Sequence, residues 1–190
     1  MAVKRRKKLR HYNHPGDAHE LTFYCHQRLP LLTRDRTRLW LIEAIEQARR
    51  DLAFDVWAYV IMPEHAHLLV WPRRTIYDTS KILSAIKRPV AIKAIRYLRK
   101  HSATWLQRLA VHTRDGKLAY RFWMPGGGYD RNVVEPRTAH EMVDYMHLNP
   151  VRRGLVVRAV DWKWSSAAWY AGVWPALLQI DPTLPRASYP

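Results

Sequence analysis

The sequence predicts an α+β domain of the ferredoxin-like (RRM-like) class, with an antiparallel sheet, helices on one face and a C-terminal extension. The first reason is the order of elements. Strand-like and helix-like stretches alternate as strand, helix, strand, strand, helix, strand, and a further helix follows. The second reason is size, because 190 residues suffice for one domain with its own core and are few for two.

The first half of the chain contains the first four of these elements. Residues 20–32 combine β-forming residues with an apolar end and predict a strand that closes near Pro30. From residue 35 to 52, apolar residues recur at helical spacing and predict an amphipathic helix. Residues 54–63 and the segment HAHLLVWP (65–72) predict two antiparallel strands joined by a tight connection.

The second half predicts two helices separated by a hairpin. Residues 78–101 form an amphipathic helix that Pro89 should kink or split. Residues 117–134 place aromatic and β-branched residues around a PGGG run, which is typical of a strand, a flexible turn and a second strand. The next helix starts near residues 136–138 and should end at Asn149, because the following proline disfavours helical backbone before it.

The predicted organisation has three parts. Residues 1–18 form a basic arm, residues 19–150 form the core domain, and residues 151–190 form a Trp-rich, then Pro-rich extension that packs on the core. No internal repeat or low-complexity segment is visible. We therefore expect one domain with tails.

Charge is the first indication of function. The chain has 32 Lys and Arg against 16 Asp and Glu, a formal net charge of +16, together with nine Trp and ten Tyr. Such an excess of positive charge attracts phosphate-rich ligands and supplies the counterion release that accompanies nucleic-acid binding. A solubility surface or an anionic membrane is the alternative, and the aromatic content favours nucleic acid.

Cysteine content and hydropathy indicate the compartment. Cys25 is the single cysteine, which excludes an intramolecular disulfide or a cysteine zinc cluster. No stretch approaches 18 apolar residues, and the basic N-terminus lacks the apolar region of a signal peptide. The expectation is a cytoplasmic protein.

Two histidines one residue apart open the predicted strand at residue 65. Side chains alternate along a strand, so His65 and His67 project from one face while Ala66 projects from the other. Two imidazoles placed in this way can bind one metal ion. An isolated pair of this kind is more often hydrogen-bonded at a sheet edge, so further residues must support a metal site.

The segment DYMHLNP (144–150) supplies such residues near the end of the last predicted helix. Tyr145 and Asn149 are four positions apart, which places a phenol and a carboxamide on one helix face. His147 points to a different face and is a candidate either for indirect support of the site or for a DNA contact. Tyrosines at such spacing are more often packing residues.

Four segments in order along the chain carry a resemblance to a known family. They are PEHAHLL (63–69), RFWMPGGGYDRNV (121–133), VDYMHLNPVRRGLV (143–156) and WSS (164–166). Together they resemble the HUH superfamily of single-tyrosine transposases, especially the REP-associated tyrosine transposases, which are related to insertion-sequence transposases. The resemblance covers roughly residues 19–170 and leaves residues 175–190 without a role.

The resemblance implies a metal-dependent single-stranded DNA endonuclease and strand transferase. Tyr145 would be the nucleophile and would form a covalent 5′-phosphotyrosine, which keeps the energy of the phosphoester for rejoining. His65, His67 and Asn149 would bind a divalent ion. Imidazole ligands generally favour Zn or Mn over Mg, whereas the family implies Mg or Mn, which we take as the expected cofactor.

The expected partner is single-stranded DNA that contains a palindromic hairpin, because relatives recognise hairpins beside the cleavage point. Monomeric and homodimeric states are both compatible with the family. Aromatic and basic side chains can stack on bases and bind phosphates. The candidate DNA contacts are Lys4, Arg5, Arg6, Lys7, Lys8, Arg10, Lys87, Arg88, Arg121, Trp123, Arg131, Arg152 and Arg153.

Two other readings remain open from sequence. A ferredoxin-like sheet rich in aromatic residues can bind single-stranded nucleic acid without chemistry. A hydrolase in which His65 and His67 bind Zn and activate water is a further alternative. It would need a third strong ligand, and an Asn four residues from a Tyr does not favour it.

Overall fold

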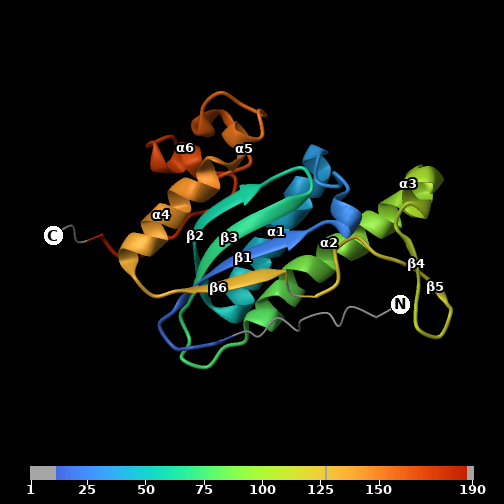
Figure 1. Ribbon diagram of the computed structural model, residues 1–190, viewed down its shortest axis with the longest axis horizontal. Coiled ribbons are helices and arrows are strands. Elements are labelled where there is room, and N and C mark those ends of the chain that lie inside the picture. Colours follow the sequence, from blue (N-terminus) through green and yellow to red (C-terminus); the bar gives the residue numbers. More distant parts are fainter. Residues whose placement is uncertain (1–11, 127, 188–190) are drawn as a thin grey trace, which may run out of the picture.

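A four-stranded antiparallel sheet forms the centre of the computed structural model, which describes residues 12–126 and 128–187 (Figure 1). The strand order is β2-β3-β1-β6, and every neighbouring pair is antiparallel. This arrangement confirms the ferredoxin-like prediction. The strands are β1 (Ala18–Tyr24), β2 (Phe54–Ile61), β3 (His65–Pro72) and β6 (Tyr129–Val133).

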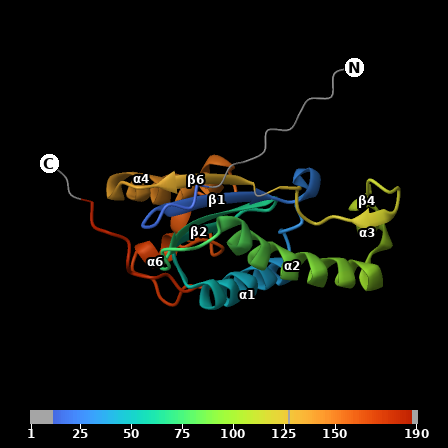
Figure 2. The ribbon, with the colours of Figure 1, turned by 90° about the horizontal axis from the view of Figure 1, so that it is seen from below.

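Helices α1 (Asp35–Leu52) and α2 (Thr79–His101) cover one face of the sheet (Figure 2). Their apolar side chains pack on the alternate strand residues, for example Leu41 and Ile45 of α1 on Phe23 of β1 in one buried cluster. The bounds of α1 match the prediction. Helix α2 continues through Pro89, so the proline neither splits it nor removes it from the sheet.

The further helix lies on the opposite face of the sheet (Figure 2). Helix α4 (Pro136–His147) buries Met142, Val143 and Met146 against β2 and β3 in a second apolar cluster. The predicted end at Asn149 is wrong, because α4 ends at His147 and Asn149 begins a short helix, α5 (Asn149–Arg152). The proline after Asn149 occupies the first turn of α5, where its missing N–H costs no hydrogen bond.

The two strands predicted around PGGG are present, but they do not pair with each other as a hairpin. Strand β5 (Leu118–Tyr120) pairs with β4 (Ala110–His112) in a separate two-stranded sheet that follows the short helix α3 (Ala103–Gln107). The strand after the glycines, β6, pairs instead with β1 in the main sheet. The residues of the turn could not distinguish a hairpin of the two flanking strands from the observed pairing of each strand with another partner. Both arrangements place a strand on each side of the glycines.

Position 128, just before β6, requires a glycine. Its φ is +84°, and a Cβ built on it would lie 2.1 Å from the carbonyl oxygen of Thr22 in β1. Only a residue without a side chain allows the two backbones to approach so closely. Gly126 also has a positive φ, of +92°, but a Cβ there meets nothing within 4 Å.

Replacing Gly128 with Ala is therefore expected to destabilise the protein by at least about 3 kcal/mol, because steric conflict with β1 adds to backbone strain. Gly126→Ala is the matched control and should cost about 1 kcal/mol through strain alone. Urea unfolding of both variants measures the difference. Equal losses would contradict the close-approach explanation.

The C-terminal extension runs along the outer edge of β2. Trp164 accepts a backbone hydrogen bond from Ile61 at 2.8 Å, and Ser166 donates one to Tyr59 at 3.0 Å. The edge of β2 is thus covered by the chain itself. The remaining short elements are η1 (His26–Arg28), η2 (Ala159–Asp161) and α6 (Ala167–Tyr170).

The first strand is shorter than the predicted 20–32, because the chain turns into η1 with positive φ at Gln27 and Arg28. Most of the basic arm, residues 1–11, lies outside the described residues. Within the described part, no helix is long and apolar enough to cross a membrane.

Candidate functional site

The register of the sheet gathers polar side chains on the face that carries α4. Thr22 of β1 lies opposite His67 of β3 on one side and opposite Tyr129 of β6 on the other. Two residues further along β1, Tyr24 lies opposite His65, and its ring stacks on that imidazole with centroids 5.0 Å apart. Alternation along the strands therefore places both histidines on the same face, as the sequence predicted.

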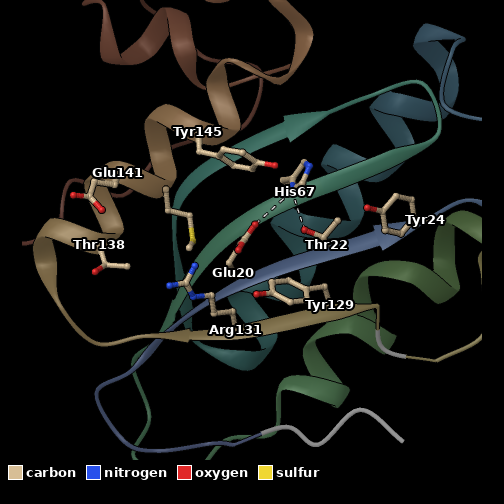
Figure 3. A pocket seen from close by; sticks show the side chains of 10 residues that line it. Glu20, Thr22, Tyr24, His67, Tyr129, Arg131, Thr138, Glu141 and Tyr145 are labelled. Carbon is tan, nitrogen blue, oxygen red and sulfur yellow. Dashed lines mark hydrogen bonds and ion pairs between the residues drawn. The ribbon is translucent and has the colours of Figure 1, made fainter. Parts of the chain in front are cut away.

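A pocket of about 540 Å³ opens between this face and α4 (Figure 3). The sheet forms its floor, and one side of α4 forms its wall. Polar, charged and aromatic groups predominate, which suits a ligand with both phosphates and rings. The lining residues are Glu20, Thr22, Tyr24, His67, Tyr129, Arg131, Thr138, Glu141, Met142 and Tyr145.

The two histidines meet through their Nε2 atoms, which are 3.0 Å apart. Both imidazoles are buried, at 6% exposure each. Burial and the neighbouring His67 lower the pKa of His65, and these effects outweigh the nearby Glu64 carboxylate, which raises it. The His65 imidazole is therefore neutral at neutral pH, as a metal ligand requires.

The Nδ1 atom of each histidine faces a side-chain oxygen. His65 Nδ1 donates to the Glu64 carboxylate at 3.2 Å. His67 Nδ1 lies 2.8 Å from the Thr22 hydroxyl and 3.7 Å from a Glu20 carboxylate oxygen. These oxygens can accept a hydrogen bond from each Nδ1–H. In that tautomer both Nε2 lone pairs converge, an arrangement that a shared cation would stabilise.

The donor set fits such a cation. Two nitrogens each about 2.1 Å from one ion, at an angle of about 90°, lie about 3.0 Å apart, and the Nε2 separation is 3.0 Å. Among the described residues no cluster of three or more His, Cys, Asp or Glu has a metal-binding arrangement. The predicted third ligand, Asn149, is an amide and of a different type, so a metal at the histidine pair remains a prediction.

Tyr145 projects from α4 into the same pocket. Its side chain is 52% exposed, and Figure 3 shows its hydroxyl directed toward His67. Arg152 lies over the ring, with its guanidinium carbon 4.7 Å from the ring centroid, and donates to the Tyr145 carbonyl at 3.3 Å. A fixed positive charge next to the phenol suits a residue that must meet a phosphate.

Asn149 lies beside Tyr145 at the end of α4 but does not line the pocket. Its amide nitrogen donates to the carbonyls of Tyr145 at 3.1 Å and Met146 at 3.3 Å. These bonds satisfy carbonyls at the helix end and use only the donors of the amide. The carboxamide oxygen is the atom that would bind a metal.

Arg153 connects the helix segment with the histidine strand. Its guanidinium binds the Glu64 carboxylate at 3.0 Å, and the same carboxylate oxygen accepts from His65. Arg153 thus helps to orient the histidine pair through Glu64, and its contact with DNA stays a prediction.

His147 anchors the helix that carries Tyr145. It is buried at 7% exposure, and its Nε2 lies 2.7 Å from the Ser166 hydroxyl. Ser166 also accepts a hydrogen bond from the backbone N–H of Tyr59 in β2. Its burial argues against the predicted alternative of a DNA contact and favours indirect support of the site, through a link from α4 to the WSS segment.

This anchor predicts a pH dependence of stability. Burial lowers the pKa of His147 to about 4 from the ordinary 6.5. Between these values the unfolded chain binds a proton that the folded chain does not, so the free energy of unfolding should fall by up to about 3 kcal/mol as the pH drops from 6.5 to 4. A His147→Gln variant cannot titrate there and should lose less; urea unfolding at pH 7 and pH 4.5 tests this, and equal losses would contradict it.

The remaining predicted DNA contacts fall into three groups. Arg131 lines the pocket. Arg121, ten residues earlier in the sequence, is exposed but does not line the pocket. Lys87, Arg88 and Trp123 line a second hollow of about 470 Å³ beside α2. Trp123 is only 6% exposed and donates its indole N–H to the Lys87 carbonyl, which argues against base stacking by this ring. Lys4, Arg5, Arg6, Lys7, Lys8 and Arg10 lie outside the described residues.

Comparison with known proteins agrees with the motifs. A Haemophilus influenzae protein named "Putative REP-associated tyrosine transposase" is 23% identical over 143 residues, which cover 72% of this chain and 76% of that protein. A solved structure of a REP-associated tyrosine transposase bound to a REP hairpin shares the fold, with a TM-score of 0.61, 22% identity and coverage of 100% of this chain and 98% of that one. The chain is similar to the REP-associated tyrosine transposases. No family model matches the sequence.

The pocket also contains residues that the motifs do not include. Glu20, Thr22 and Tyr24 alternate along β1 with apolar residues, and Tyr129 continues the same face in β6. The alternation in ELTFY is the same signal that identified His65 and His67. The sequence therefore contained the information, but only the β1–β3 register showed that the two polar faces meet.

Proposed function

We propose that this chain is a metal-dependent single-stranded DNA endonuclease and strand transferase that acts as a transposase. It would cleave DNA beside a hairpin and keep the broken strand as a 5′-phosphotyrosine on Tyr145. The expected partner follows from the relative solved with a REP hairpin and from the net charge of +16.

One observation carries the proposal. The phenol of Tyr145 and the imidazole of His67 come from elements about eighty residues apart in sequence and line one pocket (Figure 3). The Nε2 atom of His65 lies 3.0 Å from that of His67, directly beside this pocket. A nucleophile beside a candidate metal site is the arrangement that phosphoryl transfer to a side chain requires.

The proposed reaction is an in-line transfer at phosphorus. The Tyr145 oxygen forms a bond to phosphorus, and the bond from phosphorus to the 3′ oxygen of the preceding nucleotide breaks. The phenol proton leaves to water, which reaches this exposed side chain, and the departing 3′ oxygen takes up a proton. A second strand's 3′-hydroxyl can later attack the phosphotyrosine and restore the DNA backbone, which leaves Tyr145 free again.

The residues present would support each requirement of that transfer. Arg152 holds the Tyr145 ring from one side and places positive charge beside the reacting phosphate. Glu64 and Thr22 hold the imidazoles so that both Nε2 atoms face one point. A bound Mg or Mn ion would polarise the scissile phosphate and stabilise the 3′ leaving group.

A covalent trapping experiment tests the proposal. Purified protein, Mn²⁺ and single-stranded DNA from beside its gene, labelled on the strand 3′ of the cleavage point, should give a labelled protein band under denaturing conditions. Excess chelator should abolish the band. Hairpin binding that ignores the chelator and never yields an adduct would instead indicate a non-catalytic binding protein, and DNA cleavage without any adduct would indicate hydrolysis by water.

A further inference from the structure

A basic appendage, residues 96–121, projects beyond the end of the central sheet. It comprises the last turns of α2, then α3, β4 and β5, and both ribbon views show it extending away from the sheet (Figures 1 and 2). These residues include seven Lys or Arg and a single acidic residue, Asp115. The appendage thus carries a large part of the net charge on a small, separate surface.

The cations of the appendage are largely free of carboxylates. Among the described residues Asp115 pairs with Lys117 at 3.2 Å, and the other Lys and Arg of the appendage form no ion pair. Elsewhere in the protein, Arg side chains such as Arg49 and Arg158 do pair with acidic residues. Unpaired like charges repel one another, so this cluster is more favourable when a polyanion neutralises it.

Two aromatic rings of the appendage each have an arginine over one face. Arg108 lies over the Trp105 ring at 4.2 Å, and Arg99 lies over the Tyr120 ring at 5.7 Å. A protein surface that binds single strands usually presents open aromatic rings to the bases. Here both arginines are exposed and both rings are half-buried, so the cationic groups are the more accessible. Such a surface suits the phosphate backbone of a duplex, whose bases are already stacked.

The appendage is attached rigidly beside the candidate site. Leu109 and Phe122 are buried in the main core, and the Arg121 N–H closes the base of the appendage on the Leu109 carbonyl at 2.9 Å. The chain then pairs with the end of β1, where the Met124 N–H donates to Tyr24 at 2.8 Å. Tyr24 stacks on His65, so the appendage begins at the histidine end of the pocket.

We propose that the basic appendage binds the duplex stem of the DNA hairpin while the single-stranded part enters the pocket of Tyr145. This inference rests on the proposed function and adds to it a separate binding surface, residues 96–121. Contacts to stem phosphates would set the position of the cleavage point relative to the hairpin without reading the stem sequence.

The test compares two triple variants. The appendage variant changes three exposed residues of the appendage to Gln: Lys100, Arg114 and Lys117. The control variant changes three exposed residues near the other end of β3 to Gln: Arg50, Arg73 and Arg74. Fluorescence anisotropy in chelator measures affinity for a hairpin with a single-stranded extension and for a strand of equal length whose stem sequence is scrambled. Thermal unfolding checks that both variants fold.

The appendage variant should bind the hairpin about 10- to 30-fold more weakly near 150 mM salt, and the slope of log K against log salt should fall by about two to three. Its affinity for the scrambled strand should change by less than about threefold, and the control variant should lose little on either DNA. Equal losses on both DNAs, equal losses in both variants, or unchanged hairpin affinity would each overturn the inference.

The outcome is separable from that of the proposed function. If wild-type protein forms the covalent adduct but the appendage variant binds the hairpin normally, only the role of the appendage is wrong. If the appendage variant loses hairpin affinity and wild-type protein forms no adduct, the surface is correct and the transferase function is wrong.

Discussion

Replacing Tyr145 with Phe is expected to reduce the covalent DNA adduct by at least about 10³-fold, because the substitution removes the atom that attacks phosphorus. The fold should be unaffected. The Tyr145 side chain is 52% exposed, and within the described residues its hydroxyl forms no hydrogen bond. DNA affinity in chelator should also stay close to that of the wild type, since the ring and its contact with Arg152 remain. Gel analysis of labelled adduct and anisotropy measure the two effects.

Tyr129→Phe is the matched control for that experiment. Tyr129 lines the same pocket from β6 and is 48% exposed, so it offers a second phenol in a similar setting. We expect its loss to change adduct formation by less than about tenfold, through DNA positioning alone. An adduct that survives Tyr145→Phe, or that both variants lose equally, would contradict the assignment of Tyr145.

Removing either imidazole should have the second large effect. His65→Ala and His67→Ala are each expected to lower cleavage by at least about 10²-fold and to abolish tight binding of Mn²⁺, because each removes one of two converging lone pairs. Isothermal titration with Mn²⁺ provides a readout independent of activity. Both residues are buried, so thermal unfolding must show that the variants remain folded at the assay temperature.

Two further variants serve as an intermediate case and a negative control for the histidine experiment. Glu64→Gln keeps both imidazoles but weakens the carboxylate that orients His65, and it should reduce Mn²⁺ affinity by about 10- to 100-fold. His112→Ala removes an exposed imidazole on β4, away from the histidine pair, and should leave Mn²⁺ affinity unchanged. If His65→Ala and His67→Ala behave like His112→Ala, the pair is structural and the metal proposal is wrong.

Much of the fold could be predicted because local signals and tertiary packing agree there. The apolar spacing of α1 and the apolar run of β3 are strong local signals, and both elements have the predicted bounds. In the segment 117–134 the two predicted strands are present, but their pairing partners could not be predicted because the pairing of β6 is non-local. Strand β6 pairs with β1 across more than a hundred residues, and Gly128 permits the close approach to Thr22, but no property of the turn itself indicates this pairing.

In the candidate site, too, local features could be predicted from the sequence and long-range contacts could not. The common face of His65 and His67 follows from alternation, and the proximity of Tyr145 and Asn149 follows from helical spacing. The support of the site could not be predicted, because it links distant segments. Ser166 holds His147 from the C-terminal extension, and Arg153 binds Glu64 across the end of the sheet.

The most direct test of the account is to locate the DNA on the protein. Wild-type protein is allowed to react with Mn²⁺ and single-stranded hairpin DNA, the adduct is digested with nuclease and protease, and the modified peptide is sequenced by mass spectrometry. We predict a nucleotide phosphate on Tyr145 in the peptide that contains DYMHLNP, and none when His65 or His67 is Ala. A modification at another residue, or cleaved DNA with no modified peptide, would contradict the account.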